Sequence, residues 1–206
     1  MLTRLSTHLA ALVIAFTTTA SAGEFARPPQ TTEPDPNAIL AVPPRKAVRE
    51  ALAKRREHNQ AAFFAYVARG VYPHNTYRAG PLNVWRDAEG HLCAAATMIS
   101  KDGHDELAQQ TAQANNNIRL LDVVDGPLLD WMLTSGFTIE EIDRIQLPGF
   151  EPPIVDQKTL AAEDAKLKKG YTATEAFLKK HVKEDLDTAT DRLLANPALA
   201  WQVLQG

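Results

Sequence analysis

The single cysteine, Cys93, is the residue of this sequence whose type most readily supports chemistry. The three alanines at 94–96 favour a short helix that begins at the cysteine. A thiol at a helix N-terminus faces free N–H groups and a partial positive charge, which stabilise a thiolate. His91 precedes it as a candidate base, and Asp87 as the acid that would orient the base. One interpretation is therefore a cysteine-dependent hydrolase or acyltransferase with Cys93 as nucleophile.

The opposite interpretation makes Cys93 a structural thiol. Free cysteine is among the most buried residue types and often behaves as a small hydrophobe. The neighbouring alanines are typical of close packing, so this interpretation is favoured. His74 and His104 are further candidate bases and Asp122 a further orienting acid, but such partners are brought together by the fold and not by sequence spacing.

Other kinds of site lack the spacing that they need. A zinc site from His91, Cys93 and a third ligand has no Cys-x-x-Cys or His-x-x-x-His pair to support it. Asp122 and Asp125 do not form the alternating acidic pattern of a calcium loop. Phosphate loops, Gly-x-Ser-x-Gly and His-Glu-x-x-His are absent, and the asparagines at 115–117 are expected to end a helix. We expect no metal and no cofactor.

The first residues have the order of a secretory signal peptide. Arg4 is followed by an apolar run at 9–16 and by small residues at Ala20 and Ala22. We predict cleavage after Ala22 and export to the periplasm or the medium. There is no cysteine near that point to carry a lipid anchor. Because the chain has a single cysteine, it cannot form an internal disulfide.

Charge and hydropathy restrict the partners. The formal charge is -3, and loss of Arg4 with the signal makes the chain one unit more acidic, so nucleic acid is not expected to bind. After residue 22 no apolar run approaches the roughly 18 residues of a membrane span. The expected partner is a protein or glycan of the cell envelope, with the oligomeric state left open.

The hydrophobic pattern predicts a mainly α protein: a small helical domain with one short β-hairpin, plus C-terminal accessory helices. The expected segments are a signal peptide at 1–22, a Pro-rich leader at 23–44, a helical core domain at 45–150 and a charged helical tail at 151–206.

Individual elements follow from local signals. A 3.6-residue period predicts one long helix over 45–69 that ends at Gly70, and alternation at 82–85 before a turn at 87–90 predicts the hairpin. Further helices are expected at 105–115 and after Asp125. Thr138 and Glu141 have the spacing of a capping box, in which each side chain bonds the other residue's backbone N–H. In the tail, helices are expected at 157–169 and 173–195.

Aromatic residues are assigned by their surroundings. Trp85 and Trp131 are expected in the core, and Tyr72 and Tyr77 at the surface.

The run from about 81 to 148 resembles an uncharacterised family of exported bacterial proteins. The residues that carry the resemblance are Trp85, Asp87, Gly90, Cys93-Ala94, Asn116, Asp122, Trp131, Gly136-Phe137-Thr138, Glu141 and Ile145-Gln146. Leu92 and Leu147 depart from the family pattern. The resemblance implies a shared small domain and a place for Cys93 in its organising segment, and it implies no activity.

Two functions therefore stand against each other. The favoured one is a non-enzymatic binding or interaction module of the cell envelope, and the alternative is the thiol enzyme with Cys93, His91 and Asp87.

Overall fold

The computed structural model describes residues 41–148 and 156–205. The signal peptide and most of the leader expected from the sequence lie outside these residues. The elements are α1 (Arg45–Arg69), α2 (Ala94–Lys101), α3 (Asp105–Ala114), a 3-10 turn η1 (Leu120–Asp122), α4 (Gly126–Thr134), α5 (Ile139–Ile145), α6 (Gln157–Lys180), α7 (Val182–Leu194) and α8 (Pro197–Gln205). The mainly helical class expected from the sequence is confirmed.

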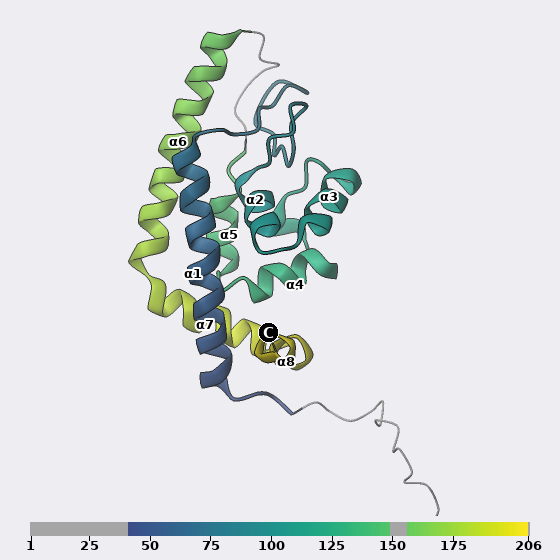
Figure 1. Cartoon of the computed structure of the whole chain (residues 1–206), viewed down its shortest axis with the longest axis vertical. Coiled ribbons are helices and arrows are strands. Elements are labelled where there is room, and N and C mark those ends of the chain that lie inside the picture. Colours follow the sequence, from purple (N-terminus) through teal and green to yellow (C-terminus); the bar gives the residue numbers. More distant parts are fainter. Residues whose placement is uncertain (1–40, 149–155, 206) are drawn as a thin grey trace, which may run out of the picture. The chain divides into compact units, whose positions relative to one another are not determined.

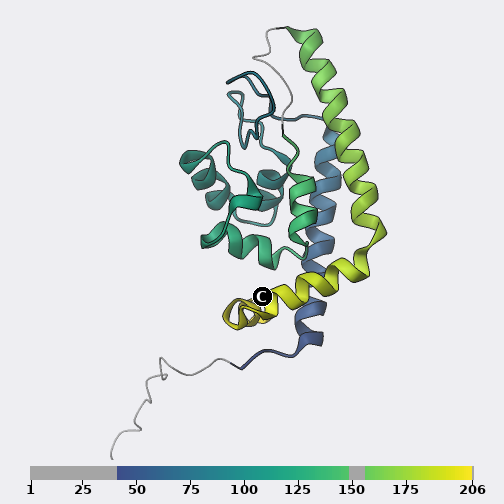
Figure 2. The ribbon, with the colours of Figure 1, turned by 180° about the vertical axis from the view of Figure 1, so that it is seen from behind.

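Helix α1 is the element on which the others pack. It has the bounds that the hydrophobic period predicts, and it ends at Gly70, which adopts a left-handed φ of 68° and donates its N–H to the Tyr66 carbonyl. Helices α2, α6, α7 and α8 all contact it. Both views show α6 running beside α1, with the α7 and α8 pair crossing its N-terminal half (Figure 1, Figure 2).

The apolar core divides into two clusters along α1. The first surrounds its C-terminal half and joins it to α2, α5 and α6, with large buried members Phe63, Tyr72, Trp85, Met98 and Tyr171. The second surrounds its N-terminal half and consists of Val48, Leu52, Leu186, Ala189, Leu193, Leu199, Ala200 and Val203. Burying one stripe of a long helix at both ends supplies most of its stability, because isolated helices are marginal in water.

Helix α6 is uninterrupted where the sequence analysis placed a break near 170–172. Gly170 lies inside the helix, where an added Cβ would come within 2.7 Å of Leu147 Cδ1, the end of a flexible side chain. The Thr172 hydroxyl donates to the Lys168 carbonyl one turn earlier in the same helix, at 2.8 Å. The break falls instead at His181, between α6 and α7.

The C-terminal helices supply core residues. Tyr171 of α6 meets the rings of Phe63, Tyr66 and Tyr72 with centroids 5.2–5.9 Å apart. Tyr72 is 0% exposed, so its expected place at the surface was wrong, whereas Tyr77 is 53% exposed as expected. Trp85 and Trp131 are buried, as predicted.

The expected β-hairpin is wrong. Over residues 41–148 and 156–205 no strand forms, and the segment holds one isolated antiparallel bridge between Arg86 and Leu92. The pairing stops on one side because Trp85 donates its N–H to the Asn116 carbonyl, at 2.8 Å. It stops on the other side because Cys93 already precedes helix α2.

A buried ion pair joins α1 to α5. The guanidinium of Arg56 and the carboxylate of Glu141 are both almost fully buried, and Arg56 Nη1 lies 2.7 Å from Glu141 Oε2. Arg56 also donates to the carbonyls of Gly136 and Leu178, at 3.1 and 3.2 Å, so it holds α6 as well. Glu141 completes the predicted capping box by accepting the Thr138 N–H at 2.9 Å.

Gly136 lets the chain approach α1 closely at this pair. Its φ is +85°, and a Cβ there would lie 2.5 Å from the Leu52 carbonyl oxygen and 2.7 Å from Arg56 Cβ. Only glycine combines that backbone conformation with that space.

Within the described residues, none of the helices combines the length with the apolar character that crossing a membrane requires.

The Arg56–Glu141 pair gives the first prediction. Arg56→Met leaves the Glu141 carboxylate buried without its cation, and we expect a loss of about 3–5 kcal/mol in the free energy of unfolding. The double variant Arg56→Met/Glu141→Gln removes both charges and keeps an oxygen for the cap, so it should be more stable than Arg56→Met alone. Urea unfolding measures both, with Arg55→Met on the same helix as the control that changes little. A double variant no more stable than the single one would contradict this account.

The pKa of Asp185, in α7, depends on the charges of the same ion pair. Burial raises the pKa of Asp185 to about 6, and the negative charge of Glu141 acts in the same direction, while Arg56 and His181 oppose it. As the pH rises, the unfolded chain loses this proton near its carboxyl pKa of about 3.9, whereas the folded protein keeps it until about pH 6. This proton favours folding at low pH, and its contribution is lost as the pH rises through about 6.

Asp185→Asn should remove this pH dependence. We expect the variant to match the parent protein near pH 4 and to be the more stable of the two at pH 7, because only the parent must then ionise a buried carboxyl. Urea unfolding at a series of pH values measures the difference. Asp191→Asn is the control of opposite sign, since a hydrogen bond from Arg45 lowers the pKa of Asp191. A parent protein that outlasts Asp185→Asn at pH 7 would overturn the assignment.

Candidate functional site

Cys93 lies at the N-terminus of α2, as expected, but it is closed to solvent. It is 3% exposed, and its Sγ accepts the Ala96 N–H at 3.4 Å as the N-cap of the helix. Burial raises the pKa of the thiol to about 11, and the backbone N–H groups of Ala96 and Ala95 oppose that rise. The helix N-terminus is therefore outweighed by desolvation, and a neutral thiol is a poor nucleophile.

His91 and Asp87 are brought together by the turn that they flank. The Asp87 carboxylate accepts the His91 N–H at 2.7 Å and lies 2.9 Å from His91 Nδ1. It also accepts the backbone N–H of His74, at 3.4 Å. In the described part of the chain, no hydrogen bond joins either residue to the Cys93 thiol, so the three do not form a hydrogen-bonded triad. Asp87 instead closes the turn.

The same turn holds one group of possible metal ligands. Donor atoms of Asp87, Glu89 and His91 lie within 4.8 Å of one another. Both oxygens of Asp87 already accept hydrogen bonds within the turn, and Glu89 is exposed. This arrangement is explained by the turn itself.

The remaining sequence candidates lie apart from Cys93 and from one another. His74 Nε2 pairs with Asp164 of α6 at 3.0 Å. Asp122 is exposed in η1. His104 faces Asp102 and belongs to a different site.

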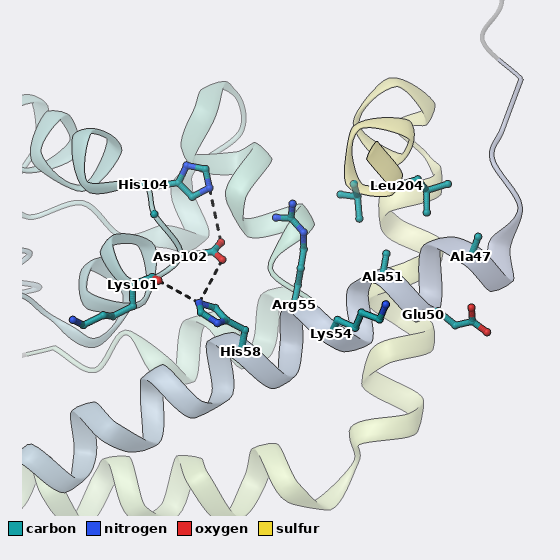
Figure 3. Close-up of a pocket in the computed structure, with 12 residues that line it drawn as sticks. Ala47, Glu50, Ala51, Lys54, Arg55, His58, Lys101, Asp102, His104 and Leu204 are labelled. Carbon is teal, nitrogen blue, oxygen red and sulfur yellow. Dashed lines mark hydrogen bonds and ion pairs between the residues drawn. The ribbon is translucent and has the colours of Figure 1, made fainter. Parts of the chain in front are cut away.

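That site is an open hollow of about 990 Å³ between α1, the end of α2 and α8 (Figure 3). Its lining residues are Ala47, Glu50, Ala51, Lys54, Arg55, His58, Lys101, Asp102, Gly103, His104, Val203 and Leu204.

Asp102 stands at one end of the hollow between two imidazoles. Figure 3 shows His58 of α1 and His104 both pointing toward it, at Nε2 to carboxylate distances of 3.8 and 3.9 Å. Trp131 Nε1 donates to Asp102 Oδ2 at 3.0 Å, which fixes the carboxylate from the core side. His58 Nε2 also lies 3.2 Å from the Lys101 carbonyl. The local fold positions all of this, because Asp102 is the C-cap residue of α2.

The charges around the hollow are unbalanced. The two acidic residues of the lining already have partners. Glu50 Oε1 lies 4.0 Å from Lys46 Nζ, and the Asp102 carboxylate contacts His58, His104 and Trp131. Lys54, Arg55 and Lys101 form no ion pair with any residue in 41–148 or 156–205, and all three line the hollow. Unpaired cations around an open hollow favour binding of an anionic ligand.

No family model matches the chain, and neither a curated protein nor a solved structure matches it.

Several polar side chains between residues 85 and 146 hold the fold together. Trp85 Nε1 donates to the Ala108 carbonyl at 2.9 Å. Asn116 exchanges two hydrogen bonds with the backbone of Arg86, at 3.0 and 2.8 Å. The Gln146 side chain joins the N–H of Leu120, at 2.8 Å, to the carbonyl of Ile118. These roles are structural.

Sequence reasoning missed most of this site. Of the residues around Asp102, the sequence singles out only His104, and no motif in it selects His58, Lys54 or Arg55. One signal was present: on α1, Ala47, Ala51, Lys54, His58 and Ala61 recur every three or four residues, away from the buried stripe. Their meeting with Asp102 depends on how α2 packs.

The buried thiol gives the third prediction. Because Cys93 is the only cysteine, a thiol reagent at neutral pH reports on it alone. We expect slow labelling of the native protein that becomes fast in denaturant, since the reagent must wait for opening of α2. Cys93→Ala should cost about 1 kcal/mol through the small cavity that it leaves. Fast native labelling with a pH midpoint below about 8.5 would revive the nucleophile.

Proposed function

We propose that the protein is a non-enzymatic binding module of the cell envelope, with the hollow between α1, α2 and α8 as its binding site. The observation that carries the proposal is an open hollow of about 990 Å³ lined by Lys54, Arg55 and Lys101, none of which forms an ion pair within residues 41–148 and 156–205. Long cationic side chains without an acidic partner in that part of the chain are available to an external anion.

The alternative function, a thiol enzyme, has less support. A nucleophilic cysteine needs an accessible thiolate and a base within hydrogen-bond reach. Cys93 is buried and its pKa is raised to about 11. His91 is hydrogen-bonded to Asp87, as a triad would need, but within the described residues no hydrogen bond joins it to the Cys93 thiol. The burial and the missing contact both oppose rapid attack on a substrate.

Export is part of the proposal. Its support is the order of Arg4, the apolar run at 9–16 and the small residues before Gly23. Mature protein isolated from the native host should begin at Gly23, and an N-terminus at Met1 in the cytoplasm would contradict the proposal.

Photo-crosslinking in intact cells of the native host tests the binding function, and it is the fourth prediction. A photoreactive residue placed at Ala51, inside the hollow, should give a discrete crosslinked product. The same residue at Lys183, exposed on α7 and outside the lining of the hollow, is the matched control and should give none. Absence of any product above background from Ala51 would overturn the proposal.

A further inference from the structure

We infer that the ligand is a protein segment, an acidic amphipathic helix that lies along the uncovered face of α1 from Ala47 to Arg69. The inference rests on the binding function proposed above and adds the ligand's chemical class and its path across the protein.

The uncovered face is longer than the hollow in Figure 3. A second hollow, of about 420 Å³, lies further along α1 and is lined by Ala61, Ala62, Ala65 and Arg69. Both hollows share His58 and Lys101 in their walls, so they adjoin. From residue 47 to residue 69 the helix rises about 33 Å, which is the length of a partner helix of about 20 residues.

Small side chains form the floor of this face. Ala47 and Ala51 lie in the first hollow, and Ala61, Ala62 and Ala65 in the second. Alanines at three- and four-residue spacing let a second helix approach closely and receive its apolar stripe.

An unpaired hydroxyl lies against the second hollow. Thr97 of α2 lines it and is only 7% exposed, yet its Oγ1 has no hydrogen-bond partner in the described part of the chain. Buried polar atoms nearly always have a partner, so this hydroxyl leaves a hydrogen bond unmade close to the hollow.

Cations flank the alanine floor along its length. Lys54, Arg55 and Lys101 stand at the first hollow and Arg69 at the end of the second, and none of them is ion-paired within residues 41–148 and 156–205. The chain as a whole carries a formal charge of -3, so this strip is a local reversal of sign. Acidic side chains beside an apolar stripe on the ligand would complement both features.

The lining favours a peptide over other polyanions. Among the phenylalanines, tyrosines and tryptophans of the described residues, only Tyr66 lines either hollow, and it is 2% exposed and packed against Tyr171. Proteins that hold single-stranded nucleic acid stack its bases on exposed aromatic rings, and the exposed rings here are limited to the imidazoles of His58 and His104, which both face Asp102. An alanine floor offers dispersion contact to aliphatic side chains, which a helix supplies.

Fluorescence anisotropy with the chain from Gly23 to Gly206 tests the inference, and it is the fifth prediction. The probe is a labelled synthetic helix of about 20 residues, with Leu and Ala on one face and Glu on both flanks. Its control replaces each Glu by Gln. We expect the acidic helix to bind at least about tenfold more tightly than the Gln helix, with affinity that falls as salt rises.

Variants locate the binding. Lys54→Glu/Lys101→Glu should weaken binding of the acidic helix by at least about tenfold, whereas Lys183→Glu, a matched charge reversal on α7, should not. Unchanged thermal unfolding of each variant shows that the fold is intact.

Three results would overturn the inference. Equal binding of the acidic and Gln helices would show that acidic side chains of the ligand do not contribute to affinity. Full affinity of Lys54→Glu/Lys101→Glu for the acidic helix would show that it does not bind on this face of α1. A sulfated polysaccharide such as heparin that binds more tightly than the acidic helix would replace a protein ligand by a glycan. In each case crosslinks from Ala51 in cells would persist if the binding function holds, and they would vanish only if that function itself is wrong.

Discussion

The ion pair between Arg56 and Glu141 is the interaction on which the rest of the fold depends. Each partner has a second role. Glu141 caps the start of α5. Arg56 also donates hydrogen bonds to the Gly136 carbonyl, just before α5, and to the Leu178 carbonyl, near the end of α6. A buried charge must be matched closely or it costs several kcal/mol. Three helices are therefore held in one register by a single guanidinium.

Much of the fold follows from local sequence signals. The stripe of Val48, Leu52 and Phe63 predicts α1, and Thr138 with Glu141 predicts the start of α5, because in both cases the interacting residues are close in sequence. The predicted hairpin does not form, although residues 82–85 do alternate, because the Trp85 N–H donates to the Asn116 carbonyl and not to a neighbouring strand. The break expected near Gly170 is wrong because the helix continues through that glycine and packs on residues distant in sequence, among them Leu147. Contacts of that range are invisible in a single sequence.

The same limit explains what was predictable of the site. The placement of Cys93 before a helix, and its structural role, follow from the alanines beside it. The hollow does not, since His58 and Asp102 are 44 positions apart and meet only through the packing of α2 on α1. A cation on the outer face of a helix reads from sequence as a solvated charge. It becomes a candidate binding group only when the fold shows that it lies beside a hollow and pairs with nothing.

The division of the core into two clusters along one helix has a consequence for how the protein opens. Neither cluster can unfold while its half of α1 stays helical and packed. The middle turns of α1, from Leu52 to Phe63, connect the two halves, so packing of both clusters protects the amide protons there. Their exchange with solvent deuterium therefore requires the opening that exposes both clusters at once, whereas the short helices α3 and α4 can exchange through smaller local openings.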